Sequence, residues 1–380
     1  MIAAGNARII FAGGGTGGHL YPALAIADRI RELLQGKHKV EIIFVGTKHG
    51  LEYRMRDSLG YPLHLINIRG LARSFSLRNL LLPFVVVGAL IKAALLLRSF
   101  APAIVIGTGG YVSWPVLKVA AWKNIPTVIQ EQNSYPGITT RQTARKARKV
   151  YLGFEGARAY LRTNERIVVT GNPVRRSIVN GNRAEALAAF KLDPDRKTIL
   201  VLGGSQGAHA VNTAILKSLE SKSLPENYQL LWQTGKRDYK DVTAQVGDKA
   251  RCCSLFPFVE RMELVYAIAD LAIARAGALT LAELAACGVP AILIPYPFAA
   301  GDHQRKNAQE TVAREMAALI DENDLDQVDI LSEAIAILES DRFTIMRRAL
   351  TAVAEKGKPA VDVIAEDIIN LIEDSRKGGV

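Results

Sequence analysis

Residues 13–19, with the sequence GGGTGGH, place five glycines beside a histidine. Glycine lets the backbone approach a ligand closely and leaves N–H groups free to bind an anion or a polar group. Histidine accepts and releases protons near neutral pH. The apolar run 9–12 predicts a strand before this segment, and Tyr21 to Leu34 predict a helix after it. The positive N-terminal end of that helix would face the bound group, so the segment has the features of an active site.

Two segments in the second half of the chain have a similar character. Residues 203–208, GGSQGA, follow the apolar run 199–202, and their amides and the Ser205 hydroxyl suit a phosphate. Residues 275–283, RAGALTLAE, follow another apolar run, and the free N–H groups of the helix that starts there suit a diphosphate. Glu283 lies in an apolar stretch, so its carboxylate needs partners, and two ribose hydroxyls would serve.

Two polar stretches occur where a ligand-binding edge is expected. Residues 130–133, QEQN, follow a predicted strand, and residues 302–307, DHQRKN, follow a proline-rich turn. Fixed donors and acceptors of this kind suit sugar hydroxyls, although polar loops are common. Glycines 13, 15 and 18 also fit the dinucleotide pattern G-x-G-x-x-G, but no acidic residue follows the second strand at 46–48. NAD or FAD binding is therefore not favoured.

Apolar runs alternate with helical stretches along the whole chain, which predicts parallel sheets covered by helices on both faces. The expected strands cover residues 8–12, 40–45, 63–66, 103–107, 127–130, 149–153, 198–202, 228–233, 251–256, 271–274 and 291–294. Both halves open with a strand, a glycine turn and a helix. We predict an α/β protein with two Rossmann-like domains facing each other across a cleft, because ligands bind beyond the carboxyl ends of such strands.

The expected domains are 1–173, 174–355 and a C-terminal helix within 356–380 that packs back on the first domain. A net charge of +11 suggests an anionic partner: nucleic acid, an acidic membrane surface or a phosphorylated substrate. Nucleic acid is the weakest of these, because the aromatic residues do not interleave with a basic stripe. Three cysteines without Cys-x-x-Cys spacing, and a start without a basic signal segment, are typical of a cytoplasmic protein.

Residues 80–97 are almost wholly apolar, and arginines 69, 73, 78 and 98 lie around them. The stretch is just short of the ~20 residues that a spanning helix needs. The strand at 103–107 must join the sheet of residues 8–12, and a single crossing would separate the two strands. Two interpretations remain: a helix buried in the first domain, or a helix or loop that dips into the bilayer interface with arginines on anionic head groups. We prefer the second.

Taken together, these motifs resemble those of the peptidoglycan N-acetylglucosaminyltransferases, GT-B enzymes that convert lipid I to lipid II. The match covers nearly the whole chain in order, and the ordered set is highly specific. It comprises GGGTGGH at 13–19, GTxxGLE at 46–52, GGYVS at 109–113, EQN at 131–133, GNPVR at 171–175, GGSQGA at 203–208, GALTLAE at 277–283 and DHQ at 302–304 with Asn307.

The resemblance implies an inverting transferase that moves N-acetylglucosamine from UDP-N-acetylglucosamine to the C4 hydroxyl of the muramoyl sugar of lipid I. The acceptor would be an undecaprenyl-diphosphate-linked muramoyl pentapeptide, and the enzyme a peripheral protein at the cytoplasmic face of the bacterial inner membrane. It would act without a metal or cofactor, and other cell-wall enzymes are possible partners. Alternatives are another UDP-sugar enzyme of this fold, such as an epimerase or lipid glycosyltransferase, and a non-catalytic UDP-sugar sensor.

The resemblance also implies roles for individual residues. His19 would deprotonate the acceptor hydroxyl, directly or through a water, and Glu131 is a competing base. Phosphate would meet Arg175 and Ser205, uracil would meet Phe258 and Val259, ribose would meet Glu283, and the donor sugar would meet Gln304. Further donor contacts are Thr16, Gly17, Gly18, Asn133, Ala278, Leu279 and Thr280. The acceptor site would use Gly14, Gly15, Thr16, His19, Gly109, Gly110, Tyr111, Glu131 and Asn133.

Two positions depart from the family pattern. Trp114 stands where a small residue is common, so the acceptor loop would have a different shape. Arg305 stands where some members have a second glutamine, which puts a sugar contact at that position in doubt.

Overall fold

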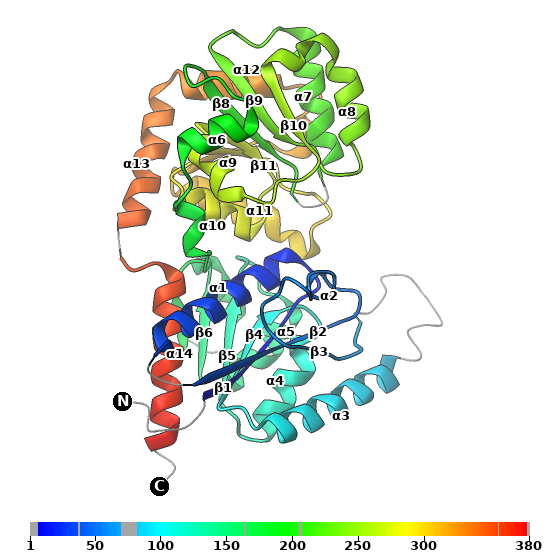
Figure 1. Ribbon diagram of the computed structural model, residues 1–380, viewed down its shortest axis with the longest axis vertical. Coiled ribbons are helices and arrows are strands. Elements are labelled where there is room, and N and C mark those ends of the chain that lie inside the picture. Colours follow the sequence, from blue (N-terminus) through cyan, green and yellow to red (C-terminus); the bar gives the residue numbers. More distant parts are fainter. Residues whose placement is uncertain are drawn as a thin grey trace. The chain divides into compact units, whose positions relative to one another are not determined.

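The computed structural model describes residues 7–36, 39–69, 82–162, 165–204, 207–355 and 357–377, and its contacts divide the chain into two compact units (Figure 1). Unit 1 comprises Met1–Arg175 and Lys358–Val380, and unit 2 comprises Arg176–Gly357. Each unit contains one sheet whose paired strands all run parallel. The chain therefore passes from unit 1 to unit 2 and back again.

Unit 1 is built on a seven-stranded sheet with the order β3-β2-β1-β4-β5-β6-β7. Its strands are β1 (Ala7–Gly13), β2 (Val40–Gly46), β3 (Leu63–Leu65), β4 (Ile104–Gly109), β5 (Thr127–Glu131), β6 (Lys149–Leu152) and β7 (Ile167–Val169). Its helices are α1 (Gly17–Leu34), α2 (Leu51–Arg54), α3 (Leu82–Phe100), α4 (Ser113–Trp122), α5 (Ile138–Thr143) and α14 (Ala360–Lys377).

The alternation of side chains along β1 divides the core of unit 1 between two faces. Ile9 and Phe11 belong to a buried cluster that includes residues of α1 and α14. Ile10 and Ala12 belong to a second cluster that includes residues of α3 and α4. Both faces of the sheet are therefore covered, which is why its central strands read as continuous apolar runs.

Unit 2 is built on a six-stranded sheet with the order β10-β9-β8-β11-β12-β13. Its strands are β8 (Lys197–Leu202), β9 (Tyr228–Gln233), β10 (Cys253–Phe256), β11 (Leu271–Ala274), β12 (Ala291–Leu293) and β13 (Ala317–Leu319). Its helices are α6 (Arg183–Phe190), α7 (His209–Ser221), α8 (Tyr239–Val246), α9 (Met262–Ile268), α10 (Ala278–Ala286), α11 (His303–Ala313), α12 (Ile330–Leu338) and α13 (Asp341–Glu355).

Short 3₁₀ segments complete both units. They are η2 (Ala144–Lys146), η3 (Glu155–Tyr160), η4 (Arg176–Val179), η5 (Gly247–Cys252), η6 (Ala300–Asp302) and η7 (Glu322–Asp324). The predicted two-domain Rossmann-like architecture with parallel sheets is confirmed. Three details differ: β7 and β13 were not predicted, α1 begins at Gly17 and not Tyr21, and β10 begins at Cys253 because η5 takes up the preceding residues.

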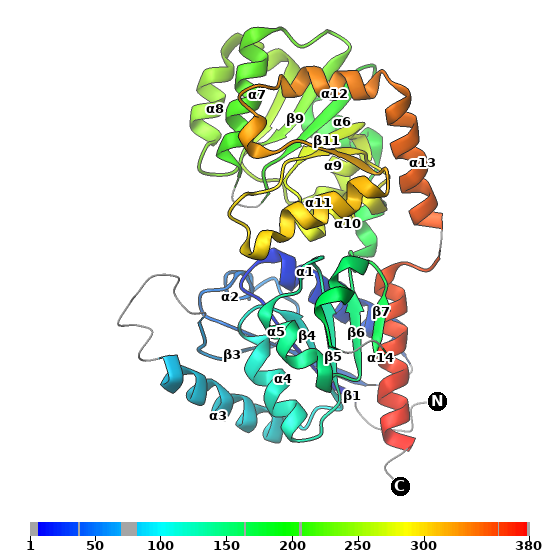
Figure 2. The ribbon, with the colours of Figure 1, turned by 180° about the vertical axis from the view of Figure 1, so that it is seen from behind.

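The C-terminal helix α14 completes unit 1. It lies beside α1 in both ribbon views (Figures 1 and 2), where Asp362 binds Arg29 Nε at 2.5 Å. Asp367 accepts hydrogen bonds from Lys149 Nζ and from Tyr151 Oη, each at 2.5 Å. The apolar side of α14 contributes Ile364, Ile368 and Ile372 to the buried cluster around α1 and β1.

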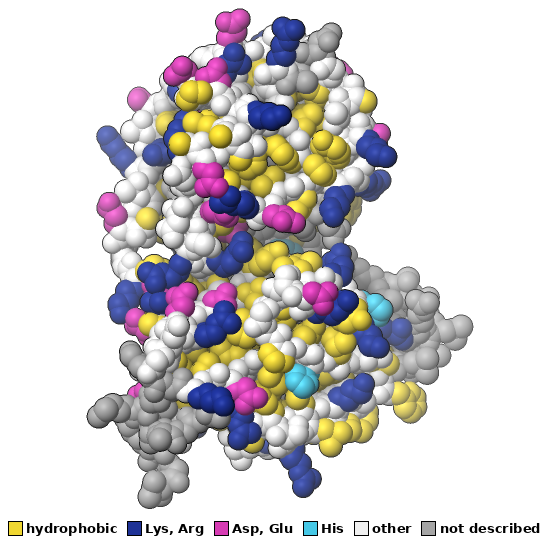
Figure 3. All heavy atoms as spheres, viewed as in Figure 1, with side chains coloured by type: hydrophobic (Ala, Val, Ile, Leu, Met, Phe, Trp, Pro, Cys, Tyr) yellow, Lys and Arg dark blue, Asp and Glu magenta, His cyan; other side chains and the backbone are white. Residues whose placement is uncertain are grey.

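Helix α3 exposes most of its apolar side chains, so the interpretation of this stretch as a buried helix is wrong. Only Ala89, Ala93 and Leu97 of the helix are buried. Exposed fractions reach 76% at Phe84, 55% at Ile91 and 63% at Leu95, and hydrophobic side chains project over α3 in Figure 3. The helix is long and apolar enough to cross a membrane. Strands β3 and β4, which precede and follow it, lie in one sheet, so a single crossing would pull that sheet apart.

Candidate active site

The first glycine segment connects β1 to α1, and its glycines are required by the protein itself. A Cβ on Gly13 would lie 1.9 Å from Thr108 Oγ1, and one on Gly14 would lie 2.4 Å from Glu52 Cδ. Thr16, with extended backbone, occupies the position before the helix and makes no side-chain cap. Helix α1 starts at Gly17, and its first backbone hydrogen bonds run from the His19 and Leu20 N–H groups to the Thr16 oxygen, so the N–H groups of Gly17 and Gly18 precede them.

The buried carboxylate of Glu52 holds this segment in place through hydrogen bonds with the backbone. Glu52 is fully buried, and its Oε2 accepts the Gly15 N–H at 2.7 Å. Its Oε1 accepts the Thr47 N–H at 2.8 Å. The Gly15 N–H is thus already bound, so the anion-binding capacity expected of this segment falls to the amides at Gly17 and Gly18. Glu52 was noted only as part of the motif at 46–52, and its role in binding the backbone was not predicted.

His19 lies in the first turn of α1 and is held by two hydrogen bonds, one at its ring and one at its backbone. Its Nδ1 lies 2.8 Å from Gln132 Oε1, on the loop after β5. Its backbone oxygen accepts a hydrogen bond from Thr108 Oγ1 at 2.9 Å. The ring packs against Gly109, where a Cβ would lie 2.6 Å from Nδ1. The structure therefore brings together three predicted segments, at 13–19, 109–111 and 130–133.

Glu131, the other candidate base, is only 3% exposed. Its Oε1 accepts the Asn133 N–H and its Oε2 accepts the Gly137 N–H, each at 3.1 Å. Both carboxylate oxygens thus organise the loop between β5 and α5. This environment suits a structural carboxylate better than a group that must meet a substrate.

The segment at 109–113 faces the glycine segment. A Cβ on Gly110, whose φ is +78°, would lie 2.5 Å from the Gly14 oxygen, so the two backbones are nearly in contact. Tyr111 is 56% exposed beside it. Trp114 follows in the first turn of α4, and its buried Nε1 has no hydrogen-bond partner in the part of the chain that the structure describes. The Trp114 side chain as a whole is half-buried.

In unit 2, Gln233 links two segments expected to bind the nucleotide. Its Nε2 donates to the Gly204 oxygen at 3.3 Å, and its Oε1 accepts the Val259 N–H at 2.9 Å. Val259 is buried, whereas Phe258 is 40% exposed and offers a ring face. Ser205 lies outside the described residues. Gln233, the last residue of β9, was not predicted, and the signal that could have marked this strand end is the glycine and lysine that follow at 235 and 236.

Glu283, on α10, is half-buried and binds Tyr266 on α9. The Tyr266 hydroxyl donates to Glu283 Oε2 at 2.9 Å, and Tyr266 is itself buried. Burial and then the charge of Glu283 raise the pKa of the nearby Cys287 thiol to about 12. The expected partner need of Glu283 is therefore met in part by Tyr266, a second residue that sequence analysis missed. Ala278, Leu279 and Thr280 form the first turn of α10.

The polar side chains of segment 302–307 make hydrogen bonds to other residues of the protein. Gln304 Oε1 accepts the Tyr296 N–H at 3.0 Å. Arg305 donates to Asp321 at 2.9 Å, which raises the pKa of the guanidinium, so this side chain is held by a carboxylate. Asn307 is fully buried and donates to the Ala276 oxygen.

Arg175 is the last residue of the first segment of unit 1, and its guanidinium lies over the Tyr21 ring of α1, 5.4 Å from the ring centre. Its contact with phosphate stays a prediction, since Ser205, the other expected phosphate ligand, lies outside the described residues.

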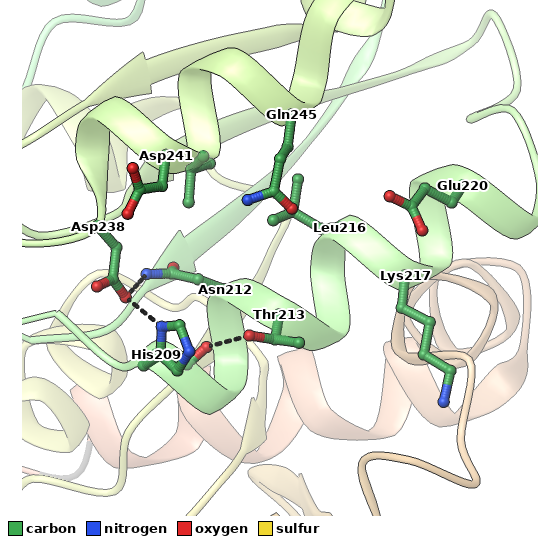
Figure 4. A pocket seen from close by; sticks show the side chains of 10 residues that line it. His209, Asn212, Thr213, Leu216, Lys217, Glu220, Asp238, Asp241 and Gln245 are labelled. Atoms are coloured by element: carbon green, nitrogen blue, oxygen red, sulfur yellow. Dashed lines mark hydrogen bonds and ion pairs between the residues drawn. The ribbon is translucent and has the colours of Figure 1, made fainter.

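A hollow of about 440 Å³ lies between α7 and α8 in unit 2 (Figure 4). Its lining includes His209, whose Nδ1 is 3.1 Å from Asp238 Oδ2, and Asn212, which donates to the same oxygen at 2.9 Å. None of its lining residues belongs to the predicted site. These contacts fix the start of α7 against the loop after β9.

Both units match known protein families. The glycosyltransferase family 28 N-terminal domain matches residues 9–152, and the family 28 C-terminal domain matches residues 198–365. The UDP-N-acetylglucosamine–N-acetylmuramyl-(pentapeptide) pyrophosphoryl-undecaprenol N-acetylglucosamine transferase of Salinibacter ruber is 40% identical over 97% of this chain and 98% of its own length. The enzyme of the same name from Flavobacterium psychrophilum is 43% identical over 84% of this chain and 86% of its own length.

Solved structures agree with this result. The crystal structure of Acinetobacter baumannii MurG matches with a TM-score of 0.73 and 27% identity, covering 96% of this chain and 99% of that one. The UDP-GlcNAc 2-epimerase from Neisseria meningitidis, bound to UDP-GlcNAc, matches with a TM-score of 0.65 but only 13% identity, covering 97% of this chain and 100% of that one. The second likeness shows a shared fold alone.

Proposed function

Because the chain belongs to glycosyltransferase family 28, and within it to the pyrophosphoryl-undecaprenol N-acetylglucosamine transferases, we propose the reaction of those relatives for it. It transfers N-acetylglucosamine from UDP-N-acetylglucosamine to a muramoyl pentapeptide carried on undecaprenyl diphosphate. The observation that carries this proposal is the 40% identity to the Salinibacter ruber transferase over nearly the whole of both chains. An epimerase is disfavoured, because the epimerase likeness extends to the fold only.

In unit 1, we assign the proton transfer to His19. Its ring nitrogen accepts the proton of the acceptor C4 hydroxyl as the oxygen attacks the anomeric carbon of the donor sugar. The bond from that carbon to the diphosphate breaks, UDP leaves with the bonding electrons, and the configuration inverts. Glu131 keeps the neighbouring loop in shape, since both of its oxygens already accept backbone N–H groups.

In unit 2, we assign the donor site to the segments that Gln233 holds together and to the first turn of α10. Phe258 offers its exposed ring to uracil, and the Glu283 carboxylate, which the Tyr266 hydroxyl orients, accepts ribose hydroxyls. The amides at the start of α10 face the developing charge of the diphosphate. Gln304 offers its amide nitrogen to the sugar, since its oxygen binds Tyr296.

The experiment is UDP release from UDP-N-acetylglucosamine that depends on an added lipid I analogue. We expect His19→Ala to lower kcat by roughly 10²- to 10⁴-fold, the usual contribution of a general base, with both substrates saturating. His64→Ala is the matched control, because His64 is an exposed residue of β3. Turnover close to wild type in His19→Ala would reject the assignment of the base. Absence of acceptor-dependent UDP release by the wild-type protein would reject the reaction itself.

We also propose that the protein lies on an anionic membrane surface as a peripheral protein, through the exposed face of α3. The side chains of Phe84, Ile91 and Leu95 share that face, and the net charge of +11 favours acidic head groups. This location gives access to a lipid-linked acceptor from the cytoplasmic side.

Co-sedimentation with vesicles that contain anionic lipid tests this location. We expect the double variant Ile91→Glu/Leu95→Glu to lose most of its binding while keeping its far-UV circular dichroism spectrum, because both side chains are exposed. Val353→Glu, on the exposed side of α13, is the control and is expected to bind like wild type. Unchanged binding of the double variant would show that α3 is not the contact.

A further inference from the structure

We propose that Gln132 is a positioning residue that fixes the tautomer of His19, with the proton on Nδ1 and the lone pair on Nε2. The catalytic meaning of this inference rests on the proposed function, whereas the tautomer itself does not. The sequence motifs assign residues 130–133 to sugar hydroxyls and give the Gln132 side chain no role toward His19. The tautomer follows from the neighbours that the nitrogen and the oxygen of the buried Gln132 amide face.

The orientation of the Gln132 amide is set by two backbone oxygens. Gln132 is 2% exposed, and its Nε2 lies 2.8 Å from the Thr108 oxygen and 3.1 Å from the Gln130 oxygen. Backbone carbonyls only accept hydrogen bonds, so the amide nitrogen must face them. A flipped amide would place its oxygen against two carbonyl oxygens, deep inside unit 1. The Oε1 atom therefore faces His19.

This orientation determines where the proton of His19 resides. An amide oxygen can only accept, so the 2.8 Å contact requires His19 Nδ1 to donate. In the neutral ring the other nitrogen, Nε2, then carries the lone pair. When Nε2 takes up a proton, Nδ1 still donates to Gln132 and no contact has to rearrange. A general base gains from this arrangement, because the competent tautomer is present before the substrate arrives.

The amide is itself held by a second layer of amides, of which Gln130 is buried and Asn172 is half-buried. Gln130 Oε1 lies 2.5 Å from Gln132 Nε2, and Gln130 Nε2 donates to Asn172 Oδ1 at 3.0 Å. Asn172 Nδ2 donates a hydrogen bond to the backbone oxygen of Gln132 at 2.9 Å. The ring of contacts explains why the GNPVR segment, far along the chain, belongs with the histidine.

Thr108 and Gly109 position the two partners relative to each other. The Thr108 oxygen accepts from Gln132, and the Thr108 hydroxyl donates to the backbone oxygen of His19. Gly109 gives the ring its place, because any Cβ there would overlap Nδ1. The positions of the His19 imidazole and of the Gln132 amide are thus both fixed by residues at the end of β4.

The test is nuclear magnetic resonance of the protein labelled with ¹⁵N-histidine, at a pH where His19 is neutral. Long-range ¹H–¹⁵N correlations distinguish a protonated from an unprotonated ring nitrogen. The chain has six histidines, and the His19 signals are assigned by their loss in His19→Gln. We expect wild type to show a protonated Nδ1 and an unprotonated Nε2. A protonated Nε2 in wild type would overturn the proposal without any variant.

Two variants separate positioning from packing. Gln132→Met removes the acceptor and is expected to shift the His19 signals toward the Nε2–H tautomer or a mixture. Thr143→Val is the control: it removes another buried polar group of unit 1, a hydroxyl of α5 that donates to the Thr139 oxygen, and it keeps the Gln132 contacts to Thr108 and His19, so the Nδ1–H pattern should remain. Identical His19 signals in wild type and Gln132→Met would also overturn the proposal.

Turnover of the same variants tests the catalytic part. We expect Gln132→Met to lower kcat by roughly 10²-fold with an unchanged KM for the donor, since only the base is affected. Thr143→Val should retain at least most of the wild-type kcat. A changed tautomer with unchanged kcat would leave the tautomer assignment standing and remove His19 from the role of base. The failure of the inference and the failure of the proposed mechanism are therefore distinguishable.

Discussion

At the scale of residues, the site is supported by carboxylates that bind the backbone. Glu52 and Glu131 are both buried, and each uses two oxygens to accept main-chain N–H groups. Charge-assisted bonds of this kind are shorter and stronger than neutral ones, so they define loop shape well. They also occupy amides that a glycine-rich sequence suggests are free for a ligand, as at Gly15.

For Glu131, we expect substitution by glutamine to act on stability more than on chemistry. Glu131→Gln keeps one acceptor oxygen and turns an NH₂ group toward the Asn133 or Gly137 N–H. The free energy of unfolding should fall by about 1–3 kcal/mol, as for an unsatisfied buried donor. Chemical denaturation measures this, and steady-state assays should show a smaller loss of kcat than His19→Ala.

The control for this variant is Glu155→Gln, which changes an exposed carboxylate. Its unfolding free energy should stay within about 0.5 kcal/mol of wild type. If Glu131→Gln were as stable as wild type but inactive, Glu131 would be the base and our assignment would be wrong.

Sequence reasoning found the residues that bear chemistry but not those that hold them. The glycine segment, His19 and Glu283 were identified by residue type and by their place after a strand. Their partners Gln132 and Tyr266 lie 113 and 17 positions away. Spacing along the chain does not reveal which distant side chains converge: Gln132 was noted only within the polar stretch 130–133, and Tyr266 lies in none of the motifs.

At the scale of elements, the long apolar runs predicted the sheets well, and some short elements were missed. β7 and β13 have three residues each and were missed, whereas β3 and β12, which are equally short, were predicted. Helix α1 starts one turn earlier than expected because its first turn contains glycines, which are poor helix formers. Pro22 lies within that helix, where its missing N–H leaves the oxygen one turn back without its usual bond.

The start of α12 allows a prediction at this scale. The Asp329 carboxylate accepts the Ser332 N–H at 3.1 Å and the Ser332 hydroxyl at 2.9 Å. Burial opposes ionisation, but these bonds, with Ser218 and Lys222, outweigh it and lower the pKa of Asp329. Since the folded pKa lies below the unfolded one, the stabilisation is present above the unfolded pKa and is lost as the pH falls through the folded pKa.

We therefore expect Asp329→Ala to lower the free energy of unfolding by about 0.5–2 kcal/mol at pH 7, the usual value of an N-cap. The difference from wild type should shrink in acid, once Asp329 is protonated in both states. Urea denaturation at pH 7 and in acid measures both effects. Asp326→Ala is the control, because that side chain is 94% exposed. An equal loss in the two variants would argue against the cap.

At the scale of the whole molecule, stability depends on a helix that returns to the first unit. Asp367 of α14 binds Lys149 and the fully buried Tyr151. Burial and the hydrogen bond to Asp367 raise the pKa of Tyr151. A raised folded pKa stabilises the protein below the unfolded value of about 10 and loses that effect as the pH rises further.

We expect Asp367→Ala to lower the free energy of unfolding by about 1–3 kcal/mol, because the Tyr151 hydroxyl is left buried without its acceptor. Hydrogen exchange should rise in peptides of unit 1 and remain unchanged in unit 2. Asp374→Ala, at an exposed position of α14, is the control and should match wild type. Faster exchange confined to unit 2 would contradict the role given to Asp367.

The return of α14 also has a consequence for synthesis on the ribosome. The core around α1 and β1 includes Ile364, Ile368 and Ile372, which are translated after all of unit 2. Translation at about 5–20 residues per second delays them by on the order of 10–40 s after residue 175. During that interval the second unit can complete its own core, whereas the first, although begun earlier, still exposes the apolar surface that α14 covers. The order of maturation is therefore the reverse of the order of translation, and the nascent first unit is the part of the chain that needs protection from aggregation.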